Sequence, residues 1–253
     1  MNHLPKPYYG SNGKPCLEES VIVVADVLGF SAMTQKAFKN NEERQQLLHI
    51  HSALEKSLKN VIDPSGVKWF TKLFTDNIVV GYRFIGTGNG SFKFPQACHS
   101  IGHFQREMTM EGFFIRGGIA VGQIHMSDTL ISGTILEELQ QAEKRALYPR
   151  IVLLDSASKQ FETRCSEPLL KEIVWTDECD GVLFINYLYP LGSMKNGQRQ
   201  EEITKHKLTI EARMDTYKSE GRIHQKYMWL AQYHNRFCSN SRYWNDSSFL
   251  IAV

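Results

Sequence analysis

The sequence of 253 residues lacks three features: a run of about twenty apolar residues, a low-complexity block and a CxxC pair of cysteines. Without a long apolar run it has no ordinary transmembrane helix. The five cysteines are scattered along the chain, which favours reduced thiols over a disulfide framework or a zinc site. The first fifteen residues are polar and lack the apolar centre of a signal peptide. We therefore expect a cytoplasmic protein that does not contact a membrane.

Charge of one sign is also scarce, because the formal net charge is only +2. Such a balance gives no reason to expect strong attraction to nucleic acid or to a membrane surface. Hydrophobic residues make up 42% of the chain and charged residues 22%, which is typical of a globular protein. The length fits one large domain, or one domain with an added tail.

The apolar pattern predicts alternating strands and helices. Short β-branched runs predict strands, and apolar residues at helical spacing predict helices. The expected strands are 20–27, 67–74, 78–84, 113–123 and 151–154, and the expected helices are 31–60, 94–110, 131–147 and 200–237. We expect the last helix, which is highly charged, to follow a polar linker at 192–198 and to be kinked at Gly221.

This order is β-α-β-β-α-β followed by a further α-β unit. It matches the ferredoxin-like split-βαβ plan, in which an antiparallel sheet carries its helices on one face. The sequence therefore predicts an α+β fold with a ferredoxin-like core and a helical C-terminal extension.

Two aspartates stand where an apolar strand gives way to a turn. Asp26 ends the run that begins at Val21, and Asp76 lies between the two strands of the expected hairpin. A carboxylate beside an apolar run loses hydration and needs a partner. Two carboxylates on adjacent strands can hold two divalent cations, which is an arrangement suited to phosphoryl transfer.

Four motifs in this order resemble those of the class III nucleotidyl cyclases. Residues 25–31 resemble the first metal motif, and residues 72–76 resemble its Lys-x-x-Gly-Asp motif with Thr75 in place of glycine. Residues 116–122 resemble the Arg-x-Gly-Ile-x-x-Gly strand, and residues 132–136 the start of the next helix. The resemblance covers about half of the chain. It implies an N-terminal arm (1–19), a cyclase catalytic domain (20–190) and a helical extension (191–253).

Within that family, the run 146–152 and the helical extension are most similar to the bacterial pyrimidine cyclases of the Pycsar antiphage system. This resemblance implies that CTP or UTP is converted to cyclic CMP or cyclic UMP, which activates a separate effector during infection. Lys72 is a pure hydrogen-bond donor, and it suits O2 of either base or N3 of cytosine, which leans slightly to CTP.

The resemblance also assigns roles to the residues of the motifs. Asp26, Val27 and Asp76 would contact two Mg²⁺ or Mn²⁺ ions, because hard cations prefer oxygen ligands. The backbone N–H groups of Leu28, Gly29, Phe30 and Ser31, at a helix N-terminus, would bind the triphosphate. Lys72 would contact the base. The family's sites lie between two subunits, so a homodimer with composite active sites is implied.

Three positions depart from the family pattern. Leu130 occupies the slot of a polar base-reading residue, and it is the residue that we place against the base. Glu137 and Gln141 occupy the slots of an asparagine and of a transition-state arginine. Lys144, Arg145 or Arg150 would supply that charge instead, and Arg150 is the one that we assign to the site. The same departures also fit a cyclase-like protein that binds nucleotide without turnover.

Other readings of the motifs remain open. Arg116 fits a structural ion pair better than a catalytic role. The glycines at 117, 118 and 122 would also be explained by close packing of strands. An RNA-recognition domain shares the ferredoxin-like plan, but it needs paired aromatic residues on its central strands, and the strand at 116–122 has none.

Overall fold

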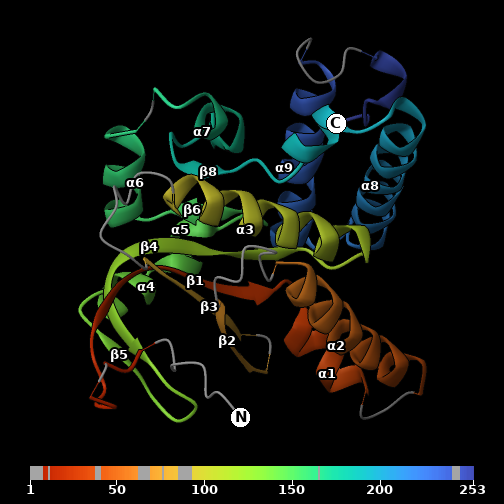
Figure 1. The fold of residues 1–253 in the computed structure, drawn as a ribbon. Helices are drawn as coiled ribbons and strands as arrows, with labels where there is room; N and C mark the ends of the chain where they lie inside the picture. Colours follow the sequence, from red (N-terminus) through yellow and green to blue (C-terminus); the bar gives the residue numbers. More distant parts are fainter. Residues whose placement is uncertain are drawn as a thin grey trace.

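Strand β1 (Glu18–Val27) lies inside the sheet, with a neighbour on each side (Figure 1). The computed structural model describes residues 8–10, 12–37, 41–61, 69–75, 77–84, 93–164, 166–240 and 246–253. Within these ranges the other strands are β2 (Trp69–Phe74), β3 (Asn77–Arg83), β4 (Ile115–Met126), β5 (Ile131–Gly133), β6 (Ile151–Leu153), β7 (Val174–Thr176) and β8 (Leu183–Ile185).

The strands form one sheet in the order β2-β3-β1-β4-β6-β8-β7, with β5 paired to β4. β1 pairs antiparallel with both β3 and β4, and β2 pairs antiparallel with β3. This is the strand order of the ferredoxin-like core. β6 extends that core by pairing parallel to β4. The predicted α+β class and the ferredoxin-like plan are confirmed.

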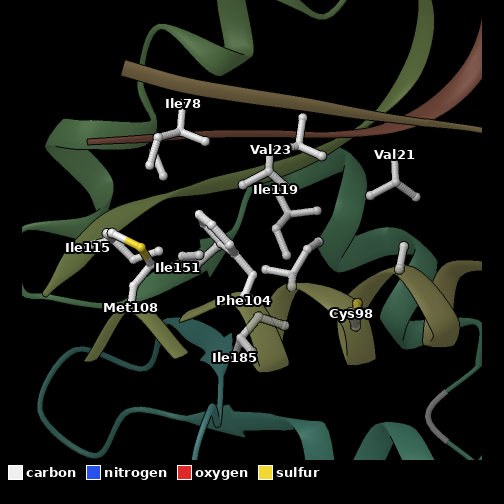
Figure 2. Close-up of a cluster of buried hydrophobic side chains, with 14 of the residues drawn as sticks. Val21, Val23, Ile78, Cys98, Phe104, Met108, Ile115, Ile119, Ile151 and Ile185 are labelled. Carbon is white, nitrogen blue, oxygen red and sulfur yellow. The ribbon is translucent and has the colours of Figure 1, made fainter. Parts of the chain in front are cut away.

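One face of the sheet is covered by helices α1 (Phe30–Ala37), α2 (Asn41–Val61) and α3 (Lys93–Met110). Alternate residues of β1, among them Val21 and Val23, point into this core, as the two-residue period of a strand requires. Figure 2 shows Phe104 and Met108 of α3 within the same cluster as Ile119 of β4. We call this side the helical face.

The opposite face is covered by other elements. It meets the short helices α4 (Leu136–Leu139) and α5 (Ala142–Ala146), and also α9 (Gly221–Cys238). Ile22 of β1, Ala120 of β4 and Trp229 of α9 belong to one buried cluster there. We call this side the aromatic face. The expectation of helices on one face only was wrong, because the C-terminal extension packs against the second face.

The remaining elements follow β6. They are α6 (Asp155–Glu162), α7 (Pro168–Ile173), the 3-10 helix η2 (Tyr189–Ser193), α8 (Asn196–Thr216) and the 3-10 helix η3 (Ser247–Phe249). α8 and α9 lie side by side (Figure 1), and Tyr217 stacks on Tyr227 with ring centroids 5.6 Å apart. The single kinked helix expected at 200–237 is therefore two helices, and α8 already begins within the expected linker at 192–198. Of the helices described, none combines the length and the apolar character needed to cross a bilayer.

Two other predicted helices were wrong. The helix expected at 131–147 begins instead with β5, whose Ile131 pairs with Met126, and it continues as α4 and α5. Gly133 permits this pairing, because a Cβ there would lie 2.4 Å from the carbonyl oxygen of Gln123. In place of the helix expected at 31–60, the described residues form two helices, α1 and α2, and Asn41, the first residue of α2, is of a type that favours a helix start over a helix interior.

Candidate active site

Asp26 is the next-to-last residue of β1, and its side chain belongs to the aromatic face, two residues on from Val24. Its cross-strand partner is Arg116 of β4. The Nε of Arg116 donates to both carboxylate oxygens of Asp26, at 3.0 and 3.2 Å, and Nη2 donates to Oδ2 at 3.2 Å. Only 16% of the Asp26 side chain is exposed. The carboxylate that was predicted to need a partner therefore has one, and the ion-pair reading of Arg116 is confirmed.

Arg116 also contacts a second carboxylate, because its Nη2 donates to Glu143 of α5. The Glu143 side chain is 65% exposed, so this second pair is the more screened of the two. Next to Arg116, Gly117 allows β4 to approach β1 closely, since a Cβ at that position would lie 2.2 Å from the carbonyl oxygen of Val24. Close strand packing therefore explains this glycine.

The turn after β1 contains the residues predicted to bind the triphosphate. Gly29 has a φ of +81°, a conformation that L residues rarely adopt, and its carbonyl accepts the N–H of Met33 as α1 begins. Phe30 is buried in the helical face, whereas Ser31 is exposed. The first N–H groups of α1 have no acceptor inside the helix, which makes this turn a candidate anion site.

Leu28 does not fit the predicted role in full. Its backbone N–H donates to the carbonyl oxygen of Phe114 at 2.8 Å. That N–H is therefore already satisfied, and the candidate anion site narrows to the N–H groups from Gly29 onwards. The side chain of Val27 is buried in the helical face, so this residue has only backbone atoms to offer a metal.

The second aspartate motif is only partly described, because Asp76 lies outside the described residues. Thr75 before it has a φ of 57°, the left-handed conformation that favours glycine. This geometry explains why glycine suits the corresponding position of the Lys-x-x-Gly-Asp motif. β3 begins at Asn77, the residue that follows Asp76 in the sequence. Because Ile78 of β3 pairs with Ala25 of β1, β3 starts at the Asp26 end of β1.

Lys72 lies on the strand before that motif. It pairs with Val79 of β3, and Val79 pairs with Val24 of β1. Residues paired in register share a face of the sheet, so Lys72 lies on the aromatic face with Asp26. It is nevertheless two strands away from β1, at roughly 4.8 Å per strand. We therefore place Lys72 near Asp26 but not in contact with it.

Leu130 lies far from Asp26. Leu130 is 54% exposed, in the turn between β4 and β5, where its carbonyl accepts the N–H of Ser127. That turn follows Met126, ten residues along β4 from Arg116 and therefore roughly 30 Å of strand away. One chain does not bring Leu130 and Asp26 to the same nucleotide.

Glu137, Gln141 and Arg145 line a polar hollow beside α4 and α5. Arg145 donates to Asp155 there, at 2.5 Å. Residues two apart on a helix do not face the same way, so Arg145 points away from Glu143 and from the Asp26 pair. Of the three cations proposed for the transition-state charge, Arg145 is thus the one beside the Glu137 and Gln141 slots.

Arg150 was predicted as a catalytic residue, and its surroundings contradict this. Its side chain has 0% exposure, and it forms ion pairs with Asp177 and Asp180. Its guanidinium also lies 5.5 Å from the centre of the Trp229 ring. Every polar group of this arginine serves the protein interior, so no substrate reaches it.

Sequence reasoning missed the basic residues of α9. Lys226 is near enough to Asp26 and Glu143 to feel both charges. Burial lowers the pKa of the Lys226 ammonium, the nearby Arg116 lowers it further, and Asp26 and Glu143 raise it. No local pattern marked this lysine, because about 200 residues separate it from Asp26. Only the packing of α9 on the sheet brings the two together.

The described residues supply only part of a metal centre. Nowhere within the described ranges do three His, Cys, Asp or Glu side chains come together. Asp26 provides the hard oxygen atoms that Mg²⁺ and Mn²⁺ prefer. Its carboxylate is now paired with Arg116, and a bound metal would partly replace that arginine. The donor chemistry therefore fits a divalent cation, with Asp76 as the expected second ligand.

The comparisons with known proteins give little. No profile of a known protein family matches the sequence, and a search of curated proteins finds no match. Among solved structures, the chain is similar to the adenylyl cyclase CyaB from P. aeruginosa, with 13% identity and a TM-score of 0.47. The match covers 67% of this chain and 92% of that one. At this level of similarity the fold assignment rests on the strand order and pairing of the chain itself.

Proposed function

We propose that this chain is a nucleotidyl cyclase that converts CTP or UTP to the 3′,5′-cyclic monophosphate. The ribose 3′-hydroxyl loses its proton to solvent, its oxygen bonds to the α-phosphorus, and the bond from that phosphorus to the pyrophosphate oxygen breaks. The observation that carries the proposal is Asp26 at the end of β1, directly before the left-handed turn at Gly29 and the start of α1. A carboxylate beside a helix N-terminus offers a cation ligand and an anion site together.

The chain's own residues would divide the work of positioning and charge stabilisation. Asp26, with Asp76, would hold two divalent cations, which lower the pKa of the 3′-hydroxyl and neutralise phosphate charge when bound. The N–H groups from Gly29 onwards would orient the phosphates. Arg116 would hold the Asp26 carboxylate in place until the nucleotide arrives, as its three hydrogen bonds to that group already do.

We further propose that the active enzyme is a homodimer with composite sites. Within one chain, Leu130 lies at the far end of β4 from Asp26, and Asp26 is not among the residues that line the hollow of Glu137, Gln141 and Arg145. A second copy would bring its own hollow to the Asp26 of the first. Arg145 would then supply the transition-state charge in place of Arg150. The cyclic product would act on a separate effector, as in the antiphage system that the sequence resembles.

Incubation of the protein with all four nucleoside triphosphates and Mn²⁺ tests the reaction directly, with products identified by mass spectrometry. We expect cyclic CMP or cyclic UMP and no cyclic purine nucleotide. Bound triphosphate without any cyclic product would favour the nucleotide-binding alternative. A cyclic purine product would overturn the pyrimidine assignment but leave the cyclase assignment standing.

Asp26→Asn tests the role of the carboxylate. We expect turnover to fall at least about 100-fold, because a metal contributes several kcal/mol to a charged transition state. The matched control is Asp215→Asn, an exposed aspartate in α8. Near-native turnover in Asp26→Asn would refute the site, provided that circular dichroism shows both variants folded.

A further inference from the structure

A basic hollow adjoins the Asp26 pair where α9 begins. It has a volume of ≈ 440 Å³ and lies between the end of α5, the residues that follow it and the first two turns of α9. Its cations are Arg116, Arg222 and Lys226, and its apolar wall is formed by Leu147, Tyr148 and Ile223. Arg116 connects the hollow to Asp26, since it donates to that carboxylate. The hollow is therefore continuous with the candidate active site.

Two of the three cations have no acidic partner among the residues that the structure describes. Arg116 is paired with Asp26 and Glu143, but neither Arg222 nor Lys226 forms an ion pair with any residue that the structure describes. Arg222 and Lys226 are four apart on α9, so they share one face of the helix, and like charges at this spacing destabilise a helix. Helix stability gives no reason for this pair, whereas an anion between them would.

Lys226 is partly desolvated in a wall of the hollow that it shares with Arg116 and Arg222. Burial and the neighbouring Arg116 and Arg222 lower the pKa of its ammonium, against the opposite effect of Asp26 and Glu143. The lowered pKa means that adding a proton there costs free energy, which a bound anion would offset. An anion with several charges gains most, because it can contact Arg222 and Lys226 together, whereas Arg116 is already shared with Asp26 and Glu143.

The wall of the hollow is held firmly in place. Tyr148 stacks on Trp229 with an interplanar angle of 4° and ring centroids 5.6 Å apart, and Arg150 lies over Tyr148. Trp229 lies on α9 itself, one turn after Lys226. The stack therefore fixes the beginning of α9 against the sheet, and with it the positions of Arg222 and Lys226.

We infer that Arg222 and Lys226 form a polyphosphate-binding subsite that receives the β- and γ-phosphates of the nucleoside triphosphate beside Asp26. The inference rests on the proposed function, because Asp26 marks where the α-phosphate would lie. The helical extension then has a direct part in binding the substrate, because α9 contributes cations to the site in addition to covering the sheet.

Titration with inorganic tripolyphosphate in EDTA, followed by calorimetry, tests the subsite without metal or turnover. We expect Arg222→Gln/Lys226→Gln to weaken binding at least about tenfold, since both charge-assisted contacts to the anion are lost. The control is Lys205→Gln/Lys218→Gln, which removes the same charge from exposed positions on and after α8. Equal binding by the two double variants, or no binding by the unmodified protein at millimolar concentration, would overturn the inference.

Lys226→Arg keeps the charge and should retain most of the binding, which separates loss of charge from loss of folding. With active protein and Mn²⁺, the glutamine double variant should raise the KM for the triphosphate more than it lowers kcat. If the unmodified protein forms no cyclic product but binds tripolyphosphate through these residues, the cyclase proposal fails and the subsite stands. If it cyclises CTP or UTP with an unchanged KM in the double variant, the subsite fails and the cyclase stands.

Discussion

The two faces of the sheet hold together by different chemistry. The helical face is packed mainly by aliphatic residues from β1, β3, β4 and α3. The aromatic face contains Trp175, Trp229 and Tyr233, and polar groups such as Arg150 and His206 are buried on the same side of the molecule. An aliphatic core tolerates changes that preserve its volume, whereas a buried polar network depends on each partner.

The candidate site lies on the aromatic face. Asp26 and Arg116 lie on the aromatic face next to α5 and α9, and Lys72 is on the same face but two strands away from β1. The helical face provides the stable support, because α1 and α3 anchor the ends of β1 and β4. The aromatic face therefore buries charge in two places, where the C-terminal helices attach and at the candidate site.

The buried arginine of the aromatic face provides the sharpest test. Arg150→Met should lower the free energy of unfolding by about 3–5 kcal/mol, because it leaves Asp177 buried without its cation. Asp177 retains hydrogen bonds from Trp229 at 2.6 Å and from the N–H of Cys179 at 2.9 Å, which replace only part of that partner. Urea unfolding at pH 7 measures the change.

Arg145→Met is the matched comparison on the exposed side of the same region. Its ion pair with Asp155 is largely solvent-exposed and contributes at most about 1 kcal/mol. We expect turnover, rather than stability, to fall in this variant. The opposite pattern, with Arg150→Met stable but inactive and Arg145→Met fully active, would return the catalytic role to Arg150.

A second test uses the two histidines buried between α8 and α9. The Nε2 of His234 donates to the carbonyl oxygen of Phe249 at 2.9 Å, which leaves its Nδ1 to accept from the Nδ1 of His206 at 2.8 Å. The Nε2 of His206 then accepts from the hydroxyl of Tyr187 at 2.8 Å. All three bonds are satisfied only when both rings are neutral.

Acid should therefore loosen this part of the aromatic face. Burial lowers the pKa of His234 from 6.5 to about 4, and burial and His234 lower the pKa of His206. Between pH 6.5 and 4 the unfolded chain binds more protons, so stability falls as the pH falls, by up to about 1.4 kcal/mol per pH unit for each histidine. Urea unfolding at pH 7, 6 and 5 measures this slope, and His234→Gln should reduce it. Equal stability at pH 7 and pH 5 would contradict the neutral network.

The predictability of the two faces from sequence also differs. Residues with a two-residue or helical period, such as those of β1 and α3, face a uniform apolar core, so the pattern alone placed them correctly. Ile131 was misplaced because a short apolar segment fits a helix as well as a strand, and only its pairing with Met126 decides. Arg150 was assigned to the site because the sequence does not show that Asp177 and Asp180 fold back onto it.

Some residues of the candidate site could be predicted from a local sequence pattern, and others could not. Asp26 and Gly29 could be predicted, because a strand end followed by a turn and a helix is a local pattern. Lys226 could not, since its approach to Asp26 depends on how α9 packs on a distant part of the chain. Local motifs thus predicted the end of β1 and missed the cations contributed by the extension.

The smallest predicted effect concerns β2, the edge strand of the sheet. Thr75 has a left-handed φ of 57°, a conformation that costs an L residue roughly 1–2 kcal/mol and that glycine adopts readily. Because glycine also loses more backbone entropy on folding, we expect Thr75→Gly to raise the free energy of unfolding by only about 0.5–1 kcal/mol. Thr71→Gly, the same substitution inside the extended strand β2, should instead lower it by a similar amount. Urea unfolding of both variants under one condition gives the comparison. A loss of stability in both would mean that the threonine side chain at 75 contributes more than its backbone conformation costs.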